Sequence, residues 1–528
     1  MKYKFILIVF TGMLFLGKAF AQYLPKSYLL GNQNSKLTKS FASGSIADNG
    51  VGDIITIGDT IWIATNNGVS LSTDNGNTWT NFTNELDNKG VSAIGYYHGV
   101  FWAALAGTYN LNGQDVPEGY GLKYTEDLGK NWVSIPQPKD SSSDSVVVYG
   151  IDTLSALPIT VDPQDVIYDI SFTPKAVWIA TWSGGIRRSF DRGKTWQRVV
   201  LPPDYLDSIT PSDTLNFCLS PQAGKICNEV NLNHLGFSVL AVNDSTVYAG
   251  TADGINKTTD ADSLYPSWIK FSHQNQKNPI TGNWVWELAY NKFNNTIWAT
   301  GWPTNDATEY YGVSFSSDGG NSWKTTLSGE KVYNFAFNNS EIIAPSDNGA
   351  FGSKDDGFTW TTPGTIQDQS SKLTLTTNGF YCAGFIGNYI WLGSDAGLVR
   401  LQNDKSSIWS GTWKIYFASQ KLTSVSDTYA YPNPFNPNTD ILKIKYSTDG
   451  KNVPVTIRIF DFGMHILRTV IQNADRGNLS HVIDEAGNVV DYWNGKDENG
   501  KIVPNGVYFY RVDAGSENPV YGKILVLH

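Results

Sequence analysis

The 528-residue sequence has few cysteines, methionines, histidines and charged residues, and each shortage excludes a class of protein. It contains 3 Cys, 3 Met and 6 His, and 17% of its residues are charged. No Cys or His has metal-ligand spacing, so no zinc centre is expected. The net charge of −10 is not gathered in one block. Because phosphate contacts need a basic face, we expect no nucleic-acid partner.

Long apolar runs are also scarce, and the one that stands out lies at the N-terminus. Lys2 and Lys4 precede an apolar run from Phe5 to Gly17, followed by Ala19-Phe20-Ala21. This order predicts a secretory signal peptide at residues 1–21, cleaved between Ala21 and Gln22. The run is shorter than the roughly 20 residues that span a bilayer, so no transmembrane segment is expected. We expect a protein that is secreted or held on the outer cell surface.

What the sequence has in abundance is aromatic residues, at 13%, and glycine, at 50 residues. Low charge with many aromatic, Gly, Ser, Thr and Asn residues is typical of an extracellular all-β protein. The length allows two or three domains. Cys218 and Cys227 share one polar loop, and a disulfide is predicted there if the compartment is oxidising. Cys382 lies in an apolar strand and is expected to be buried.

Five segments repeat the pattern small-x-Asp-x-Gly-x-(Thr/Ser/Asn)-Trp, which fits a tight hairpin. Asp accepts hydrogen bonds from nearby backbone N–H groups, Gly supplies a positive φ, and Trp buries a large apolar area. The Asp, Gly and Trp of the five copies are Asp74, Gly76 and Trp79; Asp127, Gly129 and Trp132; Asp191, Gly193 and Trp196; Asp318, Gly320 and Trp323; and Asp355, Gly357 and Trp360.

These segments resemble the Asp-box, or bacterial neuraminidase repeat, of sialidase-like β-propellers. The resemblance implies a fold and not an activity, because Asp-boxes occur in sialidases, xyloglucanase-like hydrolases, photosystem assembly factors and sortilin-type receptors. By this resemblance, the five aspartates form turns and are not catalytic.

A second repeat, two apolar strands joined by a turn, recurs seven times, and two of the seven units lack a clean Asp-box. Seven four-stranded units predict a seven-bladed β-propeller over residues 22–420. Residues 23–45 are interpreted as a strand that closes the ring on the last blade. The expected fold class is all-β, a seven-bladed propeller followed by a small Ig-like β-sandwich.

Uneven spacing between the units locates five insertions, at residues 105–120, 136–163, 202–235, 272–283 and 302–311. All should emerge on the face opposite the Asp-boxes, and function commonly lies on such loops. Exposed aromatic rings there suit sugars or protein partners. The alternative is that they pack the loops against the blades. The ligand-binding candidates are Trp182, Trp284, Trp302, Tyr310 and Tyr311.

Three carboxylates fall at one level when the first strands of the units are aligned. The aligned residues are Asp53, Ala93, Asp169, Val239, Glu287, Asn334 and Tyr381. Asp53, Asp169 and Glu287 are weak catalytic candidates, because two carboxylates suffice for a glycosidase. They could also bind Ca²⁺, although no calcium motif is present and no cofactor is expected. The alternative is that they accept hydrogen bonds from the neighbouring blade.

Sialidase activity is not expected, because the arginines that grip the substrate are missing. The propeller region has five arginines, four of them around one Asp-box, and it lacks the Phe-Arg-Ile-Pro signature of sialidases. There is also no Gly-rich phosphate loop and no Gly-x-Ser-x-Gly elbow.

The pattern changes after Gln420, with a linker at 421–430 and a second domain at 431–528. That domain contains Tyr431-Pro-Asn-Pro434, Trp493-Asn-Gly-Lys-Asp497 and Gly506-Val-Tyr-Phe-Tyr510. Short strands between turns predict a β-sandwich. These motifs resemble the type A C-terminal sorting domain of the type IX secretion system, which implies the secretion machinery as a partner. The alternative is an adhesive Ig-like module in which Asp497 is only a turn residue.

Two functions are therefore compatible with the sequence. The first is a secreted or surface-displayed binding propeller without catalysis, for a glycan or protein ligand. The second is a secreted glycoside hydrolase acting on polysaccharide.

Overall fold

The computed structural model describes residues 45–304, 306–369, 374–375, 377–418, 428–448, 451–476, 489–515 and 518–528. The predicted signal peptide, residues 23–44 of the predicted closing strand and most of the predicted linker lie outside the described residues. Regular structure in the described part is β, apart from the 3-10 helix η1 (Leu232–His234). No helix in these ranges is long and apolar enough to cross a membrane.

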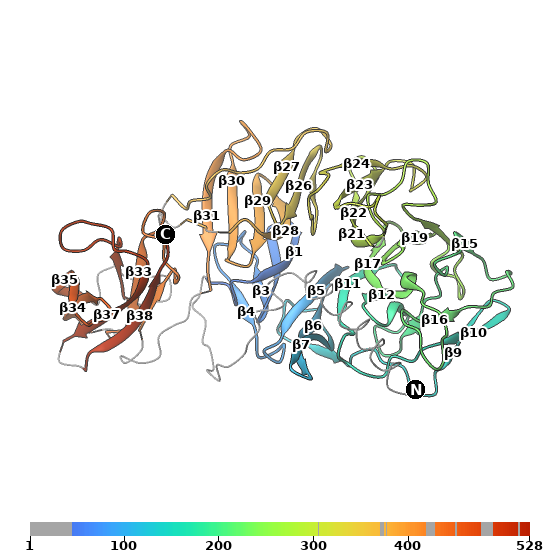
Figure 1. Ribbon diagram of the computed structural model, residues 1–528, viewed down its shortest axis with the longest axis horizontal. Coiled ribbons are helices and arrows are strands. Elements are labelled where there is room, and N and C mark those ends of the chain that lie inside the picture. Colours follow the sequence, from blue (N-terminus) through green and yellow to red (C-terminus); the bar gives the residue numbers. More distant parts are fainter. Residues whose placement is uncertain are drawn as a thin grey trace, which may run out of the picture.

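Seven antiparallel sheets form a ring, with their first strands around a common centre (Figure 1). Blade 1 holds β1 (Val51–Ile57), β2 (Thr60–Thr65), β3 (Gly68–Ser72) and β4 (Thr80–Phe82); blade 2 holds β5 (Gly90–Tyr97), β6 (Val100–Leu111), β7 (Gln114–Thr125) and β8 (Val133–Ile135); blade 3 holds β11 (Ile167–Phe172), β12 (Val177–Thr181), β13 (Gly185–Ser189) and β14 (Gln197–Arg198).

Blade 4 is a five-stranded sheet, because β15 from an insertion is added to its outer edge. Blade 4 holds β17 (Gly236–Ala241), β18 (Val247–Thr251), β19 (Gly254–Thr258), β20 (Trp268–Phe271) and β15 (Ser208–Ile209); blade 5 holds β21 (Trp284–Asn291), β22 (Thr296–Trp302), β23 (Gly312–Ser316) and β24 (Lys324–Thr326).

Blade 6 has three strands, and an isolated bridge between Gly352 and Thr361 stands where a fourth would lie. Blade 6 holds β25 (Ala336–Asn338), β26 (Glu341–Ser346) and β27 (Gly349–Ser353); blade 7 holds β28 (Phe380–Ile386), β29 (Tyr389–Ser394), β30 (Leu398–Asn403) and β31 (Gly411–Tyr416). The predicted seven-bladed propeller is confirmed.

The second strand of each blade is apolar and β-branched because its two faces meet the two neighbouring blades. In β2, Trp62, Ile63 and Ala64 are all buried. The ring closes where β1 packs against β28. Just before β1, Ile46 forms a parallel bridge with Ala418, which follows β31.

The insertions meet one another and form structure of their own. Residues 105–120 extend the β6–β7 hairpin, and Gln164 N donates to Pro117 O at 2.7 Å. Residues 136–163 supply β9 (Val146–Tyr149) and β10 (Asp152–Ala156), while 202–235 supply β16 (Cys218–Leu219). These strands form an additional sheet in the order β16-β10-β9, with β10 and β16 parallel.

The C-terminal residues form two sheets around one core, as a β-sandwich does. One sheet has the order β32-β33-β36 and the other β35-β34-β37-β38. Their strands are β32 (Thr428–Tyr431), β33 (Leu442–Tyr446), β34 (Val453–Phe460), β35 (Ile466–Arg476), β36 (Val489–Trp493), β37 (Gly506–Ala514) and β38 (Val520–Val526). The core includes Phe435, Trp493 and Tyr510, and Asp497 Oδ1 accepts from Asn499 N and Lys501 N, both at 2.9 Å.

Candidate functional site

Asp53, Asp169 and Glu287 occupy the same register position on the first strands of blades 1, 3 and 5. Each follows a β-bulge and lies opposite a small residue of the second strand, Ala64, Ala180 or Thr300. The three residues are half-buried. The charges of Asp169 and Asp53 contribute to the raised pKa of Glu287, so the three carboxyls form one electrostatic group.

Asp53 and Asp169 each connect their blade to the next one. Asp169 Oδ2 accepts from Val239 N at 2.8 Å and from Ser238 Oγ at 2.9 Å, both in blade 4. Asp53 Oδ2 accepts from Ile94 N of blade 2 at 3.3 Å. These two carboxylates satisfy backbone donors between blades, which is a structural task.

Glu287 differs, because its carboxylate accepts no hydrogen bond from the described residues; its backbone N–H donates to Thr300 Oγ1 at 3.0 Å. Burial raises the pKa of Glu287 well above its ordinary value, and the charges of Asp169 and Asp53 raise it further. Burial also raises the pKa of Asp53 to about 7 and that of Asp169 to about 6. Among the three, Glu287 is the group with the character of a proton donor.

The bulge shifts the alignment of the first strands in blades 4 and 7. The unpaired residue at the bulge is Tyr168 in blade 3 and Phe237 in blade 4, so Ser238 stands level with Asp169, where the sequence predicted Val239. In blade 7, Tyr381 is the bulged residue and Cys382 takes the level position. The predicted alignment was therefore wrong by one residue in these two blades.

Nine aromatic residues pack together from blade 3 to blade 7, beside the bulges. We call this set the aromatic arc: Tyr168, Trp182, Phe237, Trp284, Trp286, Trp302, Tyr311, Tyr333 and Tyr381. The rings of Trp286 and Trp302 stack with centroids 4.9 Å apart and an interplanar angle of 1°. The ring centroids of Tyr168 and Trp286 are 5.3 Å apart. Tyr168 and Trp286 are partly exposed.

The five aromatic ligand candidates differ in burial. Trp302 is 0% exposed and Trp284 8%, so both belong to the core of the arc. Trp182 and Tyr311 are half-buried, whereas Tyr310 is exposed at 36%. The expectation of exposed rings is corrected for Trp302 and Trp284, because each large ring finds more apolar contact between blades than at the surface. Trp286 and Tyr168, which the sequence did not single out as candidates, are half-buried members of the arc, as Trp182 and Tyr311 are.

The five Asp-x-Gly turns share one hydrogen-bond pattern. In the first, Thr78 N donates to Asp74 Oδ1 at 2.8 Å, Thr78 Oγ1 donates to Asp74 Oδ2 at 2.7 Å, and Gly76 N donates to Ser72 Oγ at 2.7 Å. Hydrogen bonds from Thr195 lower the pKa of Asp191 to about 2, and those from Ser322 do the same for Asp318. These aspartates are held ionised as turn acceptors.

The glycine of each turn lies against the preceding blade. A Cβ on Gly129 would stand 2.2 Å from Phe82 Cζ, and one on Gly76 would stand 2.3 Å from Trp391 Cη2. Both glycines have a positive φ, 86° and 77°. The turns therefore fix the contact between blades as well as the hairpin itself.

The arginines of blade 3 pair with groups of adjacent segments. Arg187 Nη1 pairs with Asp140 Oδ1 at 2.7 Å, and Arg198 Nη1 lies 3.6 Å from Asp140 Oδ2. Arg188 donates to Ala261 O at 2.9 Å and Ser263 O at 2.8 Å, in the turn of blade 4. Each guanidinium thus joins blade 3 to an adjacent segment.

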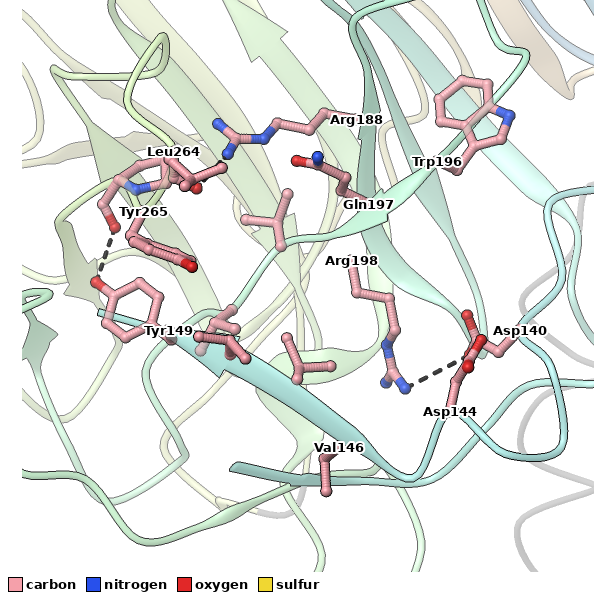
Figure 2. Close-up of a pocket in the computed structure, with 15 residues that line it drawn as sticks. Asp140, Asp144, Val146, Tyr149, Arg188, Trp196, Gln197, Arg198, Leu264 and Tyr265 are labelled. Carbon is pink, nitrogen blue, oxygen red and sulfur yellow. Dashed lines mark hydrogen bonds and ion pairs between the residues drawn. The ribbon is translucent and has the colours of Figure 1, made fainter. Parts of the chain in front are cut away.

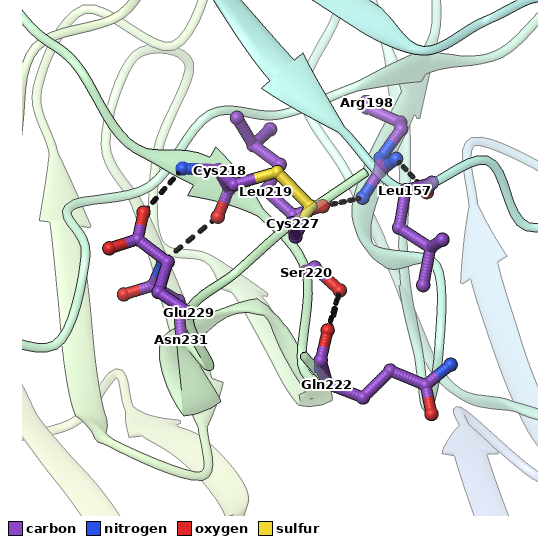
Figure 3. Close-up of a disulfide and its surroundings, with 9 residues drawn as sticks. All are labelled: Leu157, Arg198, Cys218, Leu219, Ser220, Gln222, Cys227, Glu229 and Asn231. Atoms are coloured by element: carbon purple, nitrogen blue, oxygen red, sulfur yellow. Dashed lines mark hydrogen bonds between the residues drawn. A yellow bond between two sulfur atoms is a disulfide. The ribbon is translucent and has the colours of Figure 1, made fainter. Parts of the chain in front are cut away.

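Cys218 and Cys227 form a disulfide, with their Cα atoms 5.6 Å apart (Figure 3). Cys218 belongs to β16, its N–H donates to Glu229 Oε1 at 2.7 Å, and Asn231 Nδ2 donates to its carbonyl at 2.8 Å. The disulfide and these bonds hold residues 227–231 against β16, within the 202–235 insertion. Cys382 is a buried free thiol.

A pocket of about 330 Å³, which we call the rim pocket, lies between β9, β14 and the turn of blade 4 (Figure 2). Tyr149 Oη donates to Pro266 O at 2.8 Å and closes one side. Arg198, Gln197 and Tyr265 also line it. No motif in the sequence indicates this pocket; the one signal is the run Val146-Val-Val-Tyr149 before Gly150, which is typical of a hairpin.

In the described ranges, no group of three or more His, Cys, Asp or Glu side chains is placed to hold a metal ion. Asp53, Asp169 and Glu287 lie on three different blades, and two of them are already occupied by backbone donors.

No protein-family model matches the chain. A curated protein of Neosartorya fischeri, described as a probable oligoxyloglucan-reducing end-specific xyloglucanase, is 38% identical over 94 residues. The match covers 18% of this chain and 11% of that protein, so the chain spans about a tenth of its length.

Several solved structures are similar in fold. The GH74 enzyme of Niastella koreensis is 14% identical, with a TM-score of 0.49 over 93% of this chain and 75% of that chain. YCF48 of Cyanidioschyzon merolae is 15% identical, with a TM-score of 0.42 over 70% of this chain and 100% of that chain. PorZ of Porphyromonas gingivalis, a surface component of the type IX secretion system, is 14% identical. Its TM-score is 0.39 over 93% of this chain and 71% of that chain. At such identities no activity or partner transfers to this chain.

Proposed function

We propose that this protein is a non-catalytic binding propeller, secreted or displayed on the outer cell surface, whose ligand is a glycan bound at the aromatic arc. The observation that carries the proposal is the use of Asp53 and Asp169 as acceptors between blades. Carboxylates tied to neighbouring backbone are poorly placed to exchange protons or attack a substrate.

The partly exposed rings of Trp286 and Tyr168 supply the complementary chemistry. Aromatic faces stack on the apolar faces of sugar rings, and nearby carboxyl groups can hydrogen-bond to hydroxyls. Trp302 stacks beneath Trp286 and fixes the orientation of that ring. A rigid aromatic surface loses little conformational entropy on binding.

The test is a glycan-array screen of the full secreted chain, followed by titration of any glycan that binds. Trp286→Ala should abolish binding, whereas Trp409→Ala should retain it. Trp409 is a matched control, because it is also half-buried but lies beside the outer strand of blade 7. Equal loss in both variants, or a protein ligand in place of a glycan, contradicts the assignment to the arc.

A second candidate is a glycoside hydrolase, favoured by the raised pKa and unbonded carboxylate of Glu287. In that case Glu287 acts as the general acid and Asp169 as its partner. A reducing-sugar assay on polysaccharides separates the two functions. Turnover that Glu287→Gln abolishes would establish the hydrolase and remove the binding-only proposal.

We further propose that residues 431–528 direct export as a type IX sorting domain. In this proposal the signal peptide is cleaved after Ala21, and residues 421–430 link the propeller to the sorting domain. The support is the resemblance of its motifs and the position of Trp493 and Asp497 in one compact hairpin. A chain ending at Gln420 should stay inside the cell in a host with this system. Surface display of that truncated chain contradicts the sorting role.

A further inference from the structure

We propose that the rim pocket binds an extended polypeptide segment, which is added as a strand between β9 and β14. The site is separate from the aromatic arc, because β14 is the outermost strand of blade 3. It does not depend on the binding function proposed for the arc. Figure 2 shows Val146 and Tyr149 on one side of the pocket and Gln197 and Arg198 on the other.

The first free edge belongs to β14. Val199 N donates to Ile186 O at 2.9 Å, which makes these two residues a hydrogen-bonded pair. Bonded and non-bonded pairs alternate along an antiparallel ladder. Arg198, which stands opposite Arg187, therefore directs its backbone N–H and C=O away from β13 and toward the outer edge. Arg198 lines the pocket.

The second free edge belongs to β9, the last strand in the order β16-β10-β9. Ala156 N donates to Ser145 O at 2.8 Å, so this pair is hydrogen-bonded. By the same alternation, Val146 and Val148 turn their backbone groups away from β10. Both residues line the pocket, which is thus bordered by unpaired strand edges on two sides.

Blade 4 shows that this part of the fold accepts such a strand. There β15 pairs with β20 through Ser208 and Ile209 and covers the outer edge of the blade. β15 comes from the same insertion that supplies β16. Blade 3 has no corresponding strand in the described residues, and its outer edge faces the rim pocket instead.

The lining favours a peptide over a sugar. Val147, Leu264 and Pro266 present apolar surface for peptide side chains, and the outward N–H and C=O groups of the two strand edges match the alternating donors and acceptors of a peptide backbone. Gln197 is exposed and its amide makes no hydrogen bond within the described residues. At about 330 Å³ the pocket is at the small end of ligand sites, so it takes a short segment with apolar side chains rather than a folded surface.

The test uses fluorescence anisotropy of the full secreted chain with capped eight-residue peptides that alternate Val with Thr or Val with Glu. Each parent peptide has two N-methylated twins, one methylated at the odd residues and one at the even residues. Alternate N–H groups of a strand point to opposite edges. If the segment is held between two strands, each twin loses several hydrogen bonds to one of the edges. Both twins should therefore bind at least tenfold more weakly than the parent peptide.

A variant pair tests the β9 edge from the protein side. Val148→Pro removes the N–H that faces the pocket and should weaken binding roughly three- to tenfold, because proline is tolerated at an edge but cannot donate. Val148→Thr keeps that N–H and should bind within about twofold of the native chain, since the Val148 side chain is exposed. The thermal midpoint of each variant verifies folding.

Several results overturn the proposal. They are no saturable binding of either parent peptide, equal binding of a parent and both twins, and loss in one twin only, which indicates addition to a single edge. The peptide series decides the matter even if Val148→Pro fails to fold. Displacement of the bound peptides by a peptide of residues 23–44 identifies an occupant within the chain.

Discussion

Asp169 of blade 3 accepts a hydrogen bond from the backbone N–H of Val239 in blade 4, with 2.8 Å between Val239 N and Asp169 Oδ2. The bond joins two blades at the start of their first strands, where Ser238 Oγ adds a second at 2.9 Å. A carboxylate at a propeller mouth is easily taken for a catalytic group, but this one holds adjacent sheets together.

Asp169→Ala should lower the free energy of unfolding by about 2 to 4 kcal/mol, because Val239 N–H and Ser238 Oγ lose their acceptor. Glu287→Ala, at the same register position, removes no hydrogen bond and should lower it much less. Urea denaturation of the two variants measures the difference. Equal losses would contradict the structural role of Asp169.

Protonation of Asp53 and Asp169 should add stability as the pH falls from about 7.5 to 5.5, whereas the buried His234, whose pKa is lowered to about 3, opposes it. Burial raises the pKa of Asp53 to about 7 and that of Asp169 to about 6, so the folded chain binds protons that the unfolded chain releases in this window. The stabilisation is complete below the ordinary carboxyl pKa and is lost as the pH rises through the raised values. Thermal midpoints across this range provide the measurement.

The matched control for that pH series is the triple variant Asp53→Asn, Asp169→Asn, Glu287→Gln. Its midpoint should change less over the same window, and the difference from the native chain isolates these three carboxyls. The Asp-x-Gly turns do not interfere, because the pKa of Asp191 and that of Asp318 are lowered to about 2. If the triple variant has the same pH profile as the native chain, the three carboxyls are not the cause of the pH dependence.

Gly129→Ala should destabilise the propeller by about 2 to 4 kcal/mol. Gly129 has φ 86°, and an added Cβ would lie 2.2 Å from Phe82 Cζ of the preceding blade. Gly113 has nearly the same φ, 87°, but nothing within 4 Å of an added Cβ. Gly113→Ala should therefore cost only about 1 kcal/mol, which is the backbone strain alone. Chemical unfolding of both variants measures the two free energies, and their difference is the cost of the steric clash with the preceding blade.

Reduction of the disulfide should loosen the additional sheet and leave the blades intact. The bond closes a loop with a sequence separation of 9, and a loop of this size contributes about 2.5 kcal/mol by chain entropy. Amide exchange should accelerate in β9, β10 and β16 under reductant and stay unchanged in β2 or β29. Faster exchange throughout the propeller contradicts this local role; Cys382 is buried and should not respond.

The repeats in the sequence predict the blades well, because an Asp-x-Gly turn is a local structure. Residues 72–78 contain both partners of the hydrogen bonds that close the first turn, including the bond from Gly76 N to Ser72 Oγ. The sequence also predicted that the three carboxylates share one register position on their first strands. The positions of Ser238 and Cys382 were missed because a bulge adds one residue, and the alternation of side chains does not reveal where.

The burial of Trp302 and the rim pocket depend on contacts between distant residues. Trp302 packs against Trp286 of its own blade and Tyr333 of the next. The pocket requires β10 to pair with β16, although more than 60 residues separate Ala156 from its partner Leu219. No local pattern in either insertion predicts such a parallel pairing.

The bulged residues have a consequence for how this surface can vary. Six blades each leave one residue of the first strand out of the ladder: Gly52, Ser92, Tyr168, Phe237, Trp286 and Tyr381. These side chains range from none to the largest, while the pairing around them stays the same. Each of these six blades therefore carries one position whose identity can be exchanged without rebuilding the ladder, and a new ligand preference can arise one blade at a time.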